Sequence, residues 1–437
     1  MARPNLTPKP SRRRALALTA EQRVALDALD AFVQGEEKLF LLTGYAGTGK
    51  TTLLQIFIQA LRDRGDQRTI VLTAFSNKAT KVLASMAAQW RLEVDTMTCC
   101  KLLGLRPVIN EEDGKQVFQP DRKQGSQFDR YRLVIVDECS MVNGELWGLL
   151  VNAVSNLYHQ TQILFVGDPA QLPPVNEPES ACFTQIHHRA ELTEVVRYGG
   201  AIGVIAEDIR RNLDRDGWPR FRHDTNPDKT EGCFVLPRPA WETLLIRAFT
   251  SPAYQQNPDQ VRALAYTNRR VAQLNQTIRK AIYGPNAQRF VLGERLIAIN
   301  PCLDDETLVL PTSAECEVLQ VARGREGEWP IWILEVETEE GDFKTLRVLH
   351  EAGQGEFNAR LSFLAQEKRW MEFWDFKQRF HHVDYAYSLT IHKSQGSTFQ
   401  DVFVDVPSMR VNPNVVERNQ LCYVAFTRAA NRLFIYQ

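Results

Sequence analysis

A glycine-rich segment near the N-terminus restricts the choice of fold more than any other feature of the chain. Residues 44–51, GYAGTGKT, match the pattern G-x-x-x-x-G-K-[ST]. The segment follows the apolar run 39–42 and precedes apolar residues at helical spacing, which is the strand–loop–helix context that the pattern requires. Backbone amides of such a loop surround phosphate oxygens. A chance glycine-rich turn does not account for all of this, so the sequence predicts a nucleoside-phosphate site.

Two side chains of this segment have separate roles. Lys50 is expected to reach the β- and γ-phosphates, and Thr51 to bind Mg²⁺ through its hydroxyl. The glycines allow the backbone to close around the phosphates. The predicted nucleotide contacts here are Gly44, Ala46, Gly47, Thr48, Gly49, Lys50, Thr51 and Thr52.

Two carboxylates follow a second buried strand. Residues 133–136 are a continuous apolar run, and Asp137 and Glu138 come directly after it. We assign Asp137 to the Mg²⁺ site and Glu138 to the base that polarises the attacking water. Many strands end in acidic residues, so this assignment depends on the glycine-rich loop upstream.

Three further polar residues are candidates with a simpler alternative. Gln171 lies in the proline-rich segment 167–174, where it can sense a γ-phosphate or merely belong to a turn. Arg197 and Arg428 are candidates for a catalytic arginine supplied across a cleft. From chemistry alone, a surface role is the commoner one for such arginines.

The late segment 389–398 is dense in small hydrogen-bond donors, which suit contact with phosphates and sugars without base reading. A capped helix start explains Ser397 and Thr398 equally well. The stretch 357–380 interleaves seven aromatic residues with Arg and Lys. That pattern is typical of single-strand stacking, although an amphipathic helix that buries its rings is the favoured interpretation.

Apolar runs alternate with helical stretches in two blocks, which predicts α/β domains with parallel sheets covered on both faces. A β-hairpin pattern at 106–119 interrupts the first block, and strand alternation at 315–348 with a helical stretch at 358–380 interrupts the second. The runs are 39–42, 69–73, 133–136 and 163–166, then 263–266, 403–406 and 433–436.

Composition excludes several function classes. Lys plus Arg number 52 and Asp plus Glu 53, a formal net charge of −1, so the chain is not a uniformly basic nucleic-acid binder. Basic residues can still line one groove. No apolar run approaches the roughly 18 residues that a membrane span needs. The eight cysteines include no C-x-x-C pair, so we expect a cytoplasmic protein with free thiols and no membrane contact.

Taken together, the motifs resemble those of superfamily 1 DNA helicases, in the 5′-to-3′ branch of the RecD and Dda types. The resemblance extends from residue 18 to the C-terminus. It is carried by LTAEQ (18–22), GYAGTGKTT (44–52), LVIVDECSMV (133–142), GDPAQLPPV (167–175), ELTEVVR (191–197), AYTNRRVAQLN (265–275), TIHKSQGST (390–398) and YVAFTR (423–428).

The resemblance implies two RecA-like P-loop NTPase domains in tandem, with ATP between them. Gln22 would read the adenine, Gly396 would lie at the nucleotide, and Lys50, Glu138, Gln171, Arg197 and Arg428 would be catalytic. The implied division is a basic tail (1–18), a first domain (19–190) with a hairpin or pin insertion (96–128), a second domain (191–302 and 383–437), and an SH3-like and helical insertion (303–382) over the DNA channel.

The resemblance also implies a DNA path and an activity. The DNA-binding residues would be Phe75, Ser76, Asn77, Thr98, Phe118, Thr267, Asn268, Thr390, His392, Lys393 and Ser394. Two segments depart from the family: Phe75 and Ser76 stand where Pro-Thr is usual, and Cys100 replaces a histidine. Phe75 can stack on a base or merely fill space.

The expected function is ATP-dependent unwinding with 5′-to-3′ translocation. A single-strand translocase without unwinding and an ATP-switched DNA-binding scaffold are the alternatives. The expected partners of a monomer are single-stranded DNA and single/double-strand junctions, with single-strand-binding and replication proteins as further candidates.

Overall fold

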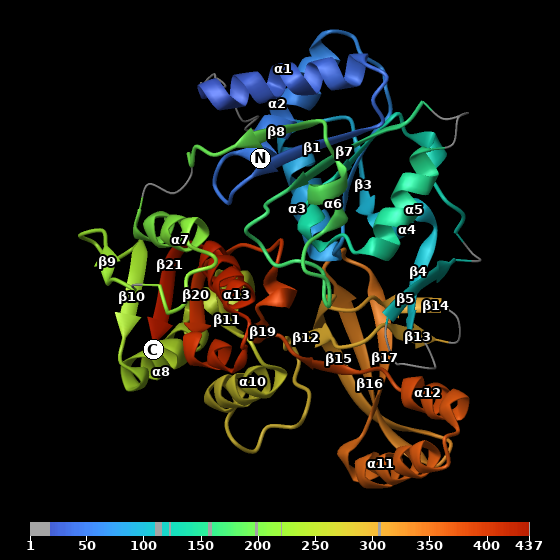
Figure 1. Ribbon diagram of the computed structural model, residues 1–437. Helices are drawn as coiled ribbons and strands as arrows, with labels where there is room; N and C mark the ends of the chain where they lie inside the picture. Colours follow the sequence, from blue (N-terminus) through green and yellow to red (C-terminus); the bar gives the residue numbers. More distant parts are fainter. Residues whose placement is uncertain are drawn as a thin grey trace, which may run out of the picture.

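The computed structural model describes residues 18–109, 116–121, 124–155, 160–196, 200–219, 221–304 and 307–436. Within these residues the strands form two six-stranded sheets that are mainly parallel, a five-stranded antiparallel sheet, and two small hairpins. Figure 1 shows the first sheet above the second, with the antiparallel sheet beside the second. The expected α/β class with two RecA-like cores is therefore confirmed.

The first sheet has the strand order β3-β2-β6-β7-β1-β8, and all its strands are parallel. The carboxyl ends of all six strands therefore meet at one edge. The strands are β1 (Leu39–Gly44), β2 (Ile70–Ala74), β3 (Asp95–Thr98), β6 (Leu133–Val136), β7 (Gln162–Gly167) and β8 (Arg189–Leu192).

Helices cover both faces of this sheet because its central strands are apolar on both sides. Leu42 and Leu72 face one cluster and Leu41 and Val71 the other, as the alternation of a strand requires. One face is covered by α1 (Ala20–Gln34), α2 (Lys50–Asp63) and α3 (Asn77–Trp90), the other by α4 (Cys99–Leu103), α5 (Gly144–Val154) and α6 (Ala181–Gln185).

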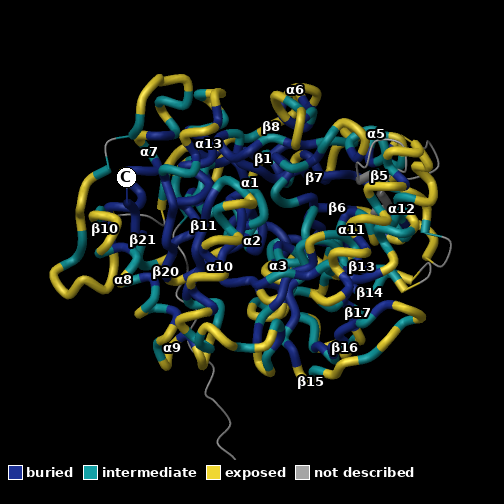
Figure 2. Tube along the Cα trace, turned by 90° about the horizontal axis from the view of Figure 1, so that it is seen from below, coloured by how far each residue is buried: buried dark blue, intermediate teal, exposed yellow. Residues whose placement is uncertain are grey.

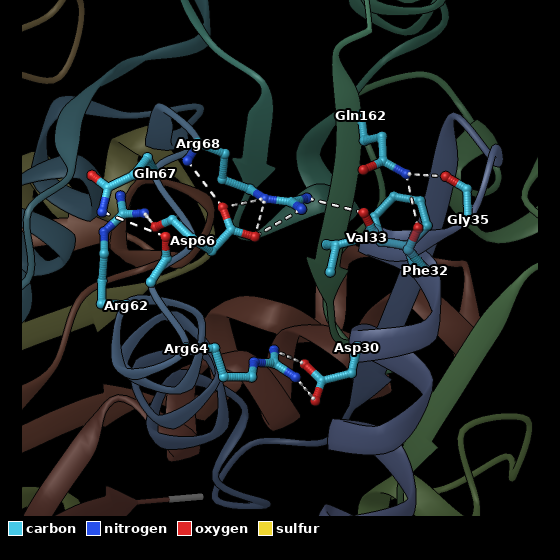
Figure 3. A network of polar contacts seen from close by, with 11 residues as sticks. Asp30, Phe32, Val33, Gly35, Arg62, Arg64, Asp66, Gln67, Arg68 and Gln162 are labelled. Atoms are coloured by element: carbon cyan, nitrogen blue, oxygen red, sulfur yellow. Dashed lines mark hydrogen bonds and ion pairs between the residues drawn. The ribbon is translucent and has the colours of Figure 1, made fainter.

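A polar network fixes the carboxyl-terminal end of α1 against the sheet (Figure 3). The Gln162 amide donates to the carbonyls of Phe32 and Glu37 at 2.8 and 2.9 Å. Arg64 forms a two-pronged bond with Asp30 at 2.8 and 2.7 Å, although pairs this exposed contribute little to stability. Since α1 is held at this end, its other end has a fixed position beside the glycine-rich loop 44–51, called the nucleotide loop below.

The second sheet has the order β19-β11-β20-β21-β10-β9, and only the edge strand β9 is antiparallel. Helices α7 (Ala201–Arg211) and α13 (Val415–Thr427) cover one face, and α8 (Arg238–Phe249) and α10 (Asn268–Tyr283) the other. The strands are β9 (Asp224–Thr225), β10 (Gly232–Leu236), β11 (Val261–Ala265), β19 (Ser388–Thr390), β20 (Phe399–Asp405) and β21 (Ala429–Tyr436). Buried strands run through the centre of the molecule and exposed residues lie at its rim (Figure 2).

The antiparallel sheet has the order β17-β16-β15-β12-β18 and shares a core with one face of the second sheet. Its first and last strands along the chain, β12 and β18, lie just outside the expected 303–382 segment, so the sheet extends one strand beyond each of those limits. The strands are β12 (Arg295–Ala298), β15 (Glu315–Glu326), β16 (Trp329–Thr338), β17 (Phe343–Leu349) and β18 (Val383–Tyr385), and the hairpin of β13 (Cys302–Asp304) and β14 (Thr307–Leu310) lies within the same region.

The aromatic stretch forms two helices, α11 (Glu351–Gln366) and α12 (Trp370–Gln378), at the end of this sheet (Figure 1). Phe357 and Phe380 are buried against Trp329, as the amphipathic interpretation requires. Phe363 and Trp370 are exposed, so burial accounts for only part of the stretch.

The hairpin expected at 106–119 is present as β4 (Leu105–Ile109) and β5 (Gln116–Pro120), paired antiparallel. Its turn, residues 110–115, lies outside the described residues. The Phe118 amide donates to Glu145 on α5 at 3.3 Å, which joins the base of the hairpin to the first sheet's helices. All eight cysteines are free. Among the described helices, none is both long enough and apolar enough for a membrane span.

Candidate functional site

The loop between β1 and α2 has the backbone shape that its glycines permit. Gly47 and Gly49 have φ of 83° and 85°, in the left-handed region that disfavours other residues. Lys50 begins α2 and folds back over the loop, where its Nζ donates to the carbonyls of Gly44 and, at 3.1 Å, Tyr45. The ammonium thus lies directly over the loop that would hold phosphate.

Two further segments contact this loop. Gln22 is buried, and its Nε2 donates to the Thr48 carbonyl at 3.0 Å, while its Oε1 accepts from the Thr19 amide in a capping box. The Val196 amide donates to the Gly47 carbonyl at 2.9 Å. Arg197 itself lies outside the described residues. Thr51 and Thr52 are half-buried in the first turn of α2.

The two carboxylates lie at the end of β6, at the same edge as the loop. The Glu138 amide donates to Asp137 Oδ1 at 2.9 Å, and Glu138 has a φ of 53°. Burial and the neighbouring charge of Glu138 raise the pKa of Asp137 to about 7, against the opposing effects of the Glu138 amide and the Lys50 ammonium. The Lys50 cation is therefore close enough to act on Asp137, which brings together both halves of the predicted nucleotide site.

A buried tyrosine from the second half of the chain reaches the same loop. The Tyr423 hydroxyl accepts from the Ala46 amide at 2.8 Å and donates to Asp168 Oδ2 at 2.7 Å. Asp168 follows β7, and its other oxygen accepts from the Ala170 amide at 2.9 Å. The nucleotide loop, the segment after β7 and helix α13 are joined at one hydroxyl.

A second buried contact crosses between the halves through two glutamines. Gln395 Nε2 donates to Gln171 Oε1 and to Ser140 Oγ, both at 3.1 Å. Gln171 is thereby placed at the interface, beside the 3₁₀ turn that follows Glu138. Gly396 has a φ of 75°, and a Cβ built there would lie 3.9 Å from Glu138 Cγ, so this loop closely covers the proposed base.

Arg428 caps the carboxyl end of α13 and is buried. Its guanidinium donates to the carbonyls of Val424 and Ser397, both at 3.1 Å. Among the described residues no hydrogen bond joins Arg428 to the loop 44–51. The structure therefore places this arginine within the second half, one residue past the helix that carries Tyr423.

Four of the predicted DNA-binding residues have the same local role. Each is a Ser or Thr at or just beyond the carboxyl end of a strand, and its hydroxyl accepts from the backbone amide three residues later, as an N-cap does. They are Ser76 after β2, Thr98 at the end of β3, Thr267 after β11 and Thr390 at the end of β19. The strands β2 and β3 are neighbours, as are β11 and β19, so the four hydroxyls form two equivalent pairs.

Four other predicted DNA-binding residues lie close to these hydroxyls in the sequence: Phe75, Asn77, Asn268 and His392. Asn77 and Asn268 are the first residues of α3 and α10. Phe75 is half-buried and packs against the core, so filling space accounts for it in part. The His392 ring lies 6.1 Å from the Tyr266 ring.

Burial affects the three neighbouring predicted DNA-binding residues His392, Lys393 and Ser394. It lowers the pKa of both His392 and Lys393. Ser394 is fully buried, with its hydroxyl donating to the Ile391 carbonyl at 2.7 Å, so it is less accessible to DNA than its neighbours.

Sequence reasoning missed three residues that join the two halves: Tyr423 and Asp168 beside the nucleotide loop, and Gln395, which bonds to Gln171 and Ser140. All three lie inside motifs that carried the resemblance. Their pairing is not visible in the sequence, because the partners are 224 or 255 residues apart.

Comparisons with known proteins agree with this arrangement. A family model described as an AAA domain matches residues 17–216, and one described as a UvrD-like helicase C-terminal domain matches residues 385–436. The ATP-dependent DNA helicase dda of Enterobacteria phage T4 is 27% identical, over 95% of this chain and 98% of its own length. The ATP-dependent DNA helicase Pif1 of Bdellovibrio bacteriovorus is 23% identical, over 90% of this chain and 83% of its own.

Solved structures support the same fold. A Bacteroides Pif1 helicase in complex with ADP-AlF3 and single-stranded DNA has a TM-score of 0.52 at 16% identity, covering 96% of this chain and 92% of that one. A Pif1 structure described for DNA unwinding at forked duplex has a TM-score of 0.53, also at 16% identity and with the same coverage. Over nearly its whole length this chain is therefore similar in sequence to the ATP-dependent DNA helicases dda and Pif1, and it has the fold of the Pif1 helicases.

Proposed function

We propose that this chain is an ATP-dependent DNA helicase that moves 5′ to 3′ along single-stranded DNA and unwinds duplex, coupled to hydrolysis of Mg-ATP. One observation carries the proposal: the nucleotide loop of the first half is contacted directly by the second half, through Tyr423 on Ala46. Changes at the nucleotide therefore act on the interface between two units that each present hydroxyls for DNA.

The residues around the loop fit Mg-ATP as the substrate. Lys50 would bind the terminal phosphates, Glu138 would hold the attacking water, and Gln171, Arg197 and Arg428 would respond to the γ-phosphate. The Thr51 hydroxyl and the Asp137 carboxylate are oxygen donors of the kind that Mg²⁺ prefers. Burial has raised the pKa of Asp137, so a cation beside it would relieve an unfavourable charge. The metal would supply positive charge that stabilises the phosphates.

The DNA strand would lie across both sheets at their carboxyl edges. Ser76 and Thr98 would contact phosphates from the first sheet, and Thr267 and Thr390 from the second. These two pairs of hydroxyls form two equivalent DNA-binding sites, here called grips. The units that carry them would close and open with the nucleotide cycle. If the affinities of the two grips for DNA alternate during the cycle, the protein moves stepwise along the strand. Phosphate contacts of this kind carry no sequence information.

Polarity and strand separation come from the resemblance and from the hairpin. The Dda and RecD branch implies 5′-to-3′ movement. The β4–β5 hairpin, with Phe118 near its base, would serve as the pin that splits the duplex. A monomer contains both grips and the complete cleft, so we propose that the active unit is a monomer acting on single strands and junctions.

Unwinding of fluorescent forked duplexes with 5′ or 3′ overhangs tests the function. We expect unwinding only of substrates that offer a 5′ single strand, and ATP turnover that single-stranded DNA stimulates. Turnover and translocation without any strand separation would support the translocase alternative. DNA binding without turnover would support a scaffold, and preference for 3′ overhangs would reject the polarity.

A deletion tests the pin. Replacing 108–118 by a short Gly-Ser linker should leave DNA-stimulated ATP turnover intact while unwinding is lost, because the hairpin lies apart from the nucleotide loop. Unwinding that survives this replacement would reject the hairpin as the separating element.

A further inference from the structure

The Tyr423 hydroxyl makes two contacts with distant segments that its sequence motif does not predict. It lies 2.8 Å from the Ala46 amide of the nucleotide loop and 2.7 Å from Asp168 Oδ2. Asp168 is 0% exposed and Tyr423 1% exposed, so neither bond has water as a ready substitute. One buried hydroxyl thus connects three segments: the loop after β1, the segment after β7, and helix α13.

The neighbouring residue of the loop is also held by the second half. The Arg210 guanidinium lies 3.9 Å from the centre of the Tyr45 ring, in a cation–π contact. Arg210 belongs to α7, which packs against α13 in the second half (Figure 1). Two consecutive residues, Tyr45 and Ala46, therefore contact two helices that pack on each other.

Helix α13 connects this contact to Arg428. Tyr423 lies in its last turns, and Arg428 caps its end with a bond from Nε to the Val424 carbonyl. A rigid helix gives the two side chains a fixed relation, so the position of the Tyr423 hydroxyl on the loop determines where Arg428 stands. Arg428 has no hydrogen bond of its own to the loop among the described residues, which leaves Tyr423 as the anchor.

We propose that Tyr423 is a positioning residue for ATP hydrolysis: its hydroxyl holds α13 against the nucleotide loop and Asp168, and so aligns Arg428 for the γ-phosphate. This inference rests on the proposed function, since it assigns a role within that hydrolysis. The tyrosine touches no reacting atom. Its effect operates through the arginine and is therefore confined to turnover.

The test is Tyr423→Phe, which removes one oxygen and leaves the ring in place. We expect kcat in saturating single-stranded DNA to fall about 10- to 100-fold, because small misplacements of a catalytic group have effects of this size. The KM for ATP should stay within about twofold, since Lys50 and the loop amides still bind the phosphates. A normal kcat, or a raised KM with a normal kcat, would overturn the proposal.

A matched control separates positioning from the general loss of a buried hydroxyl. Tyr387 is 2% exposed and donates to buried Glu294 at 2.7 Å, away from the nucleotide loop. Tyr387→Phe removes the same group from a similar setting, and its kcat should match that of the wild type. An equal loss of kcat in both variants would mean that the effect is structural.

A double variant tests the route through Arg428. If Tyr423 acts by aligning this arginine, then adding Tyr423→Phe to Arg428→Lys should lower kcat little further. Losses that multiply would show independent action and overturn the proposal. If Tyr423→Phe is too unstable to assay, Asp168→Ala removes the acceptor of the other bond of the Tyr423 hydroxyl and should reproduce the loss of kcat at unchanged KM; a normal kcat there would also overturn it.

The wild-type protein distinguishes this inference from the proposed function. Absence of DNA-stimulated ATP turnover in the wild type would reject both. Stimulated turnover in the wild type that is unaffected by Tyr423→Phe would reject the positioning role alone.

Discussion

The two six-stranded sheets share the order of five strands and carry different chemistry. In the first sheet the later strands β6 and β7 lie between β2 and β1, and in the second sheet β20 and β21 lie between β11 and β10. In this order β1 corresponds to β10, β2 to β11, β3 to β19, β6 to β20 and β7 to β21. The edge strands differ, because β8 is parallel to β1 whereas β9 is antiparallel to β10. Corresponding loops therefore show what the sequence has changed on a common framework.

The corresponding strands β1 and β10 lead into very different turns. After β1 comes the glycine-rich loop, with Lys50 as the first residue of the following helix. After β10 come Pro237 and Arg238, and α8 starts at once with a further proline in its first turn. A short proline turn has no run of amides to surround a phosphate. The nucleotide site therefore depends on the loop after β1 and does not follow from the fold alone.

The acidic strand ends differ in the same way. Asp137 after β6 is half-buried beside another carboxylate, and its loss of solvation together with the charge of Glu138 raises its pKa. Asp405 at the end of β20 is buried, but it is paired with Arg270, and it accepts from the Ser408 amide at 3.1 Å. One acid is left for a cation and the other is neutralised within the fold. The hydroxyl pairs proposed for DNA, in contrast, are alike in both sheets.

Replacing Lys50 at the start of α2 and Arg238 at the start of α8 should give the largest difference in ATP turnover between the two sheets. Lys50→Ala should abolish ATP turnover and unwinding, because it removes the ammonium that lies over the loop carbonyls and would bind the terminal phosphates. Arg238→Ala changes the residue at the corresponding helix start, which is exposed and paired with Glu242, and turnover should be unaffected. The measurement is steady-state ATP turnover with single-stranded DNA, and turnover in the lysine variant would contradict the nucleotide site.

The acidic strand ends give the second comparison. Glu138→Gln keeps the size of the side chain but cannot accept a proton, so kcat should fall about 10²-fold or more while ATP still binds. Asp405→Asn should instead lower the unfolding midpoint, since Arg270 loses its ionic partner, and leave the ATP KM unchanged. Fluorescent-nucleotide binding and thermal unfolding separate the two effects. Loss of nucleotide affinity with turnover retained would show that Glu138 is not the base.

Local patterns in the sequence were enough to predict the four central strands of the first sheet, the glycine-rich loop and the two acids, but not the edge strands β3 and β8. Ser76 caps α3 and Thr19 caps α1, and such caps, like apolar spacing, act over a few residues and so leave a local pattern. What could not be predicted depends on contacts between distant segments. Gln22 bonds to Thr48, Tyr423 bonds to Asp168, and Arg428 bonds within its own half; none of these follows from spacing along the chain.

A buried charge cluster is the clearest feature without a local signal. Glu315 at the start of β15 accepts from Lys78 of α3 at 2.9 Å and from Arg262 of β11 at 3.1 Å. It therefore joins corresponding parts of the first and second sheets to the antiparallel sheet. Burial alone would raise the pKa of Glu315, but the charges of Arg262 and Lys78 outweigh it and lower the pKa to about 2.

Removing this charge tests how firmly the sheets are joined. Glu315→Gln should lower the free energy of unfolding by about 3 kcal/mol at neutral pH, since it leaves the buried Arg262 without its main partner. The native pKa is below the ordinary value of 4.5, so the carboxylate stabilises the fold above about pH 4.5, and this contribution is lost as the pH falls toward 2.

The measurement is denaturant unfolding at several pH values. The difference between the wild type and Glu315→Gln should shrink between pH 5 and pH 3. Glu328→Gln, on the exposed turn between β15 and β16, is the control and should change stability little. A difference that does not depend on pH would show that the charge of Glu315 is not what stabilises the junction.

The smallest expected effect is on the salt dependence of DNA binding, where a lysine of each sheet can be compared. Lys393 follows Thr390 in the second sheet and has no ion-pair partner among the described residues, whereas Lys78 of the first sheet is neutralised by Glu315. Binding of single-stranded DNA releases counterions, with a slope of about −0.7 in log affinity against log salt for each phosphate neutralised. Lys393→Gln should therefore make the slope shallower by about 0.7, and Lys78→Gln should leave it unchanged while lowering stability. Fluorescence anisotropy over a series of salt concentrations measures both. If Lys78→Gln changed the slope and Lys393→Gln did not, the DNA would contact the first sheet through α3 and the proposed equivalence of the two grips would fail.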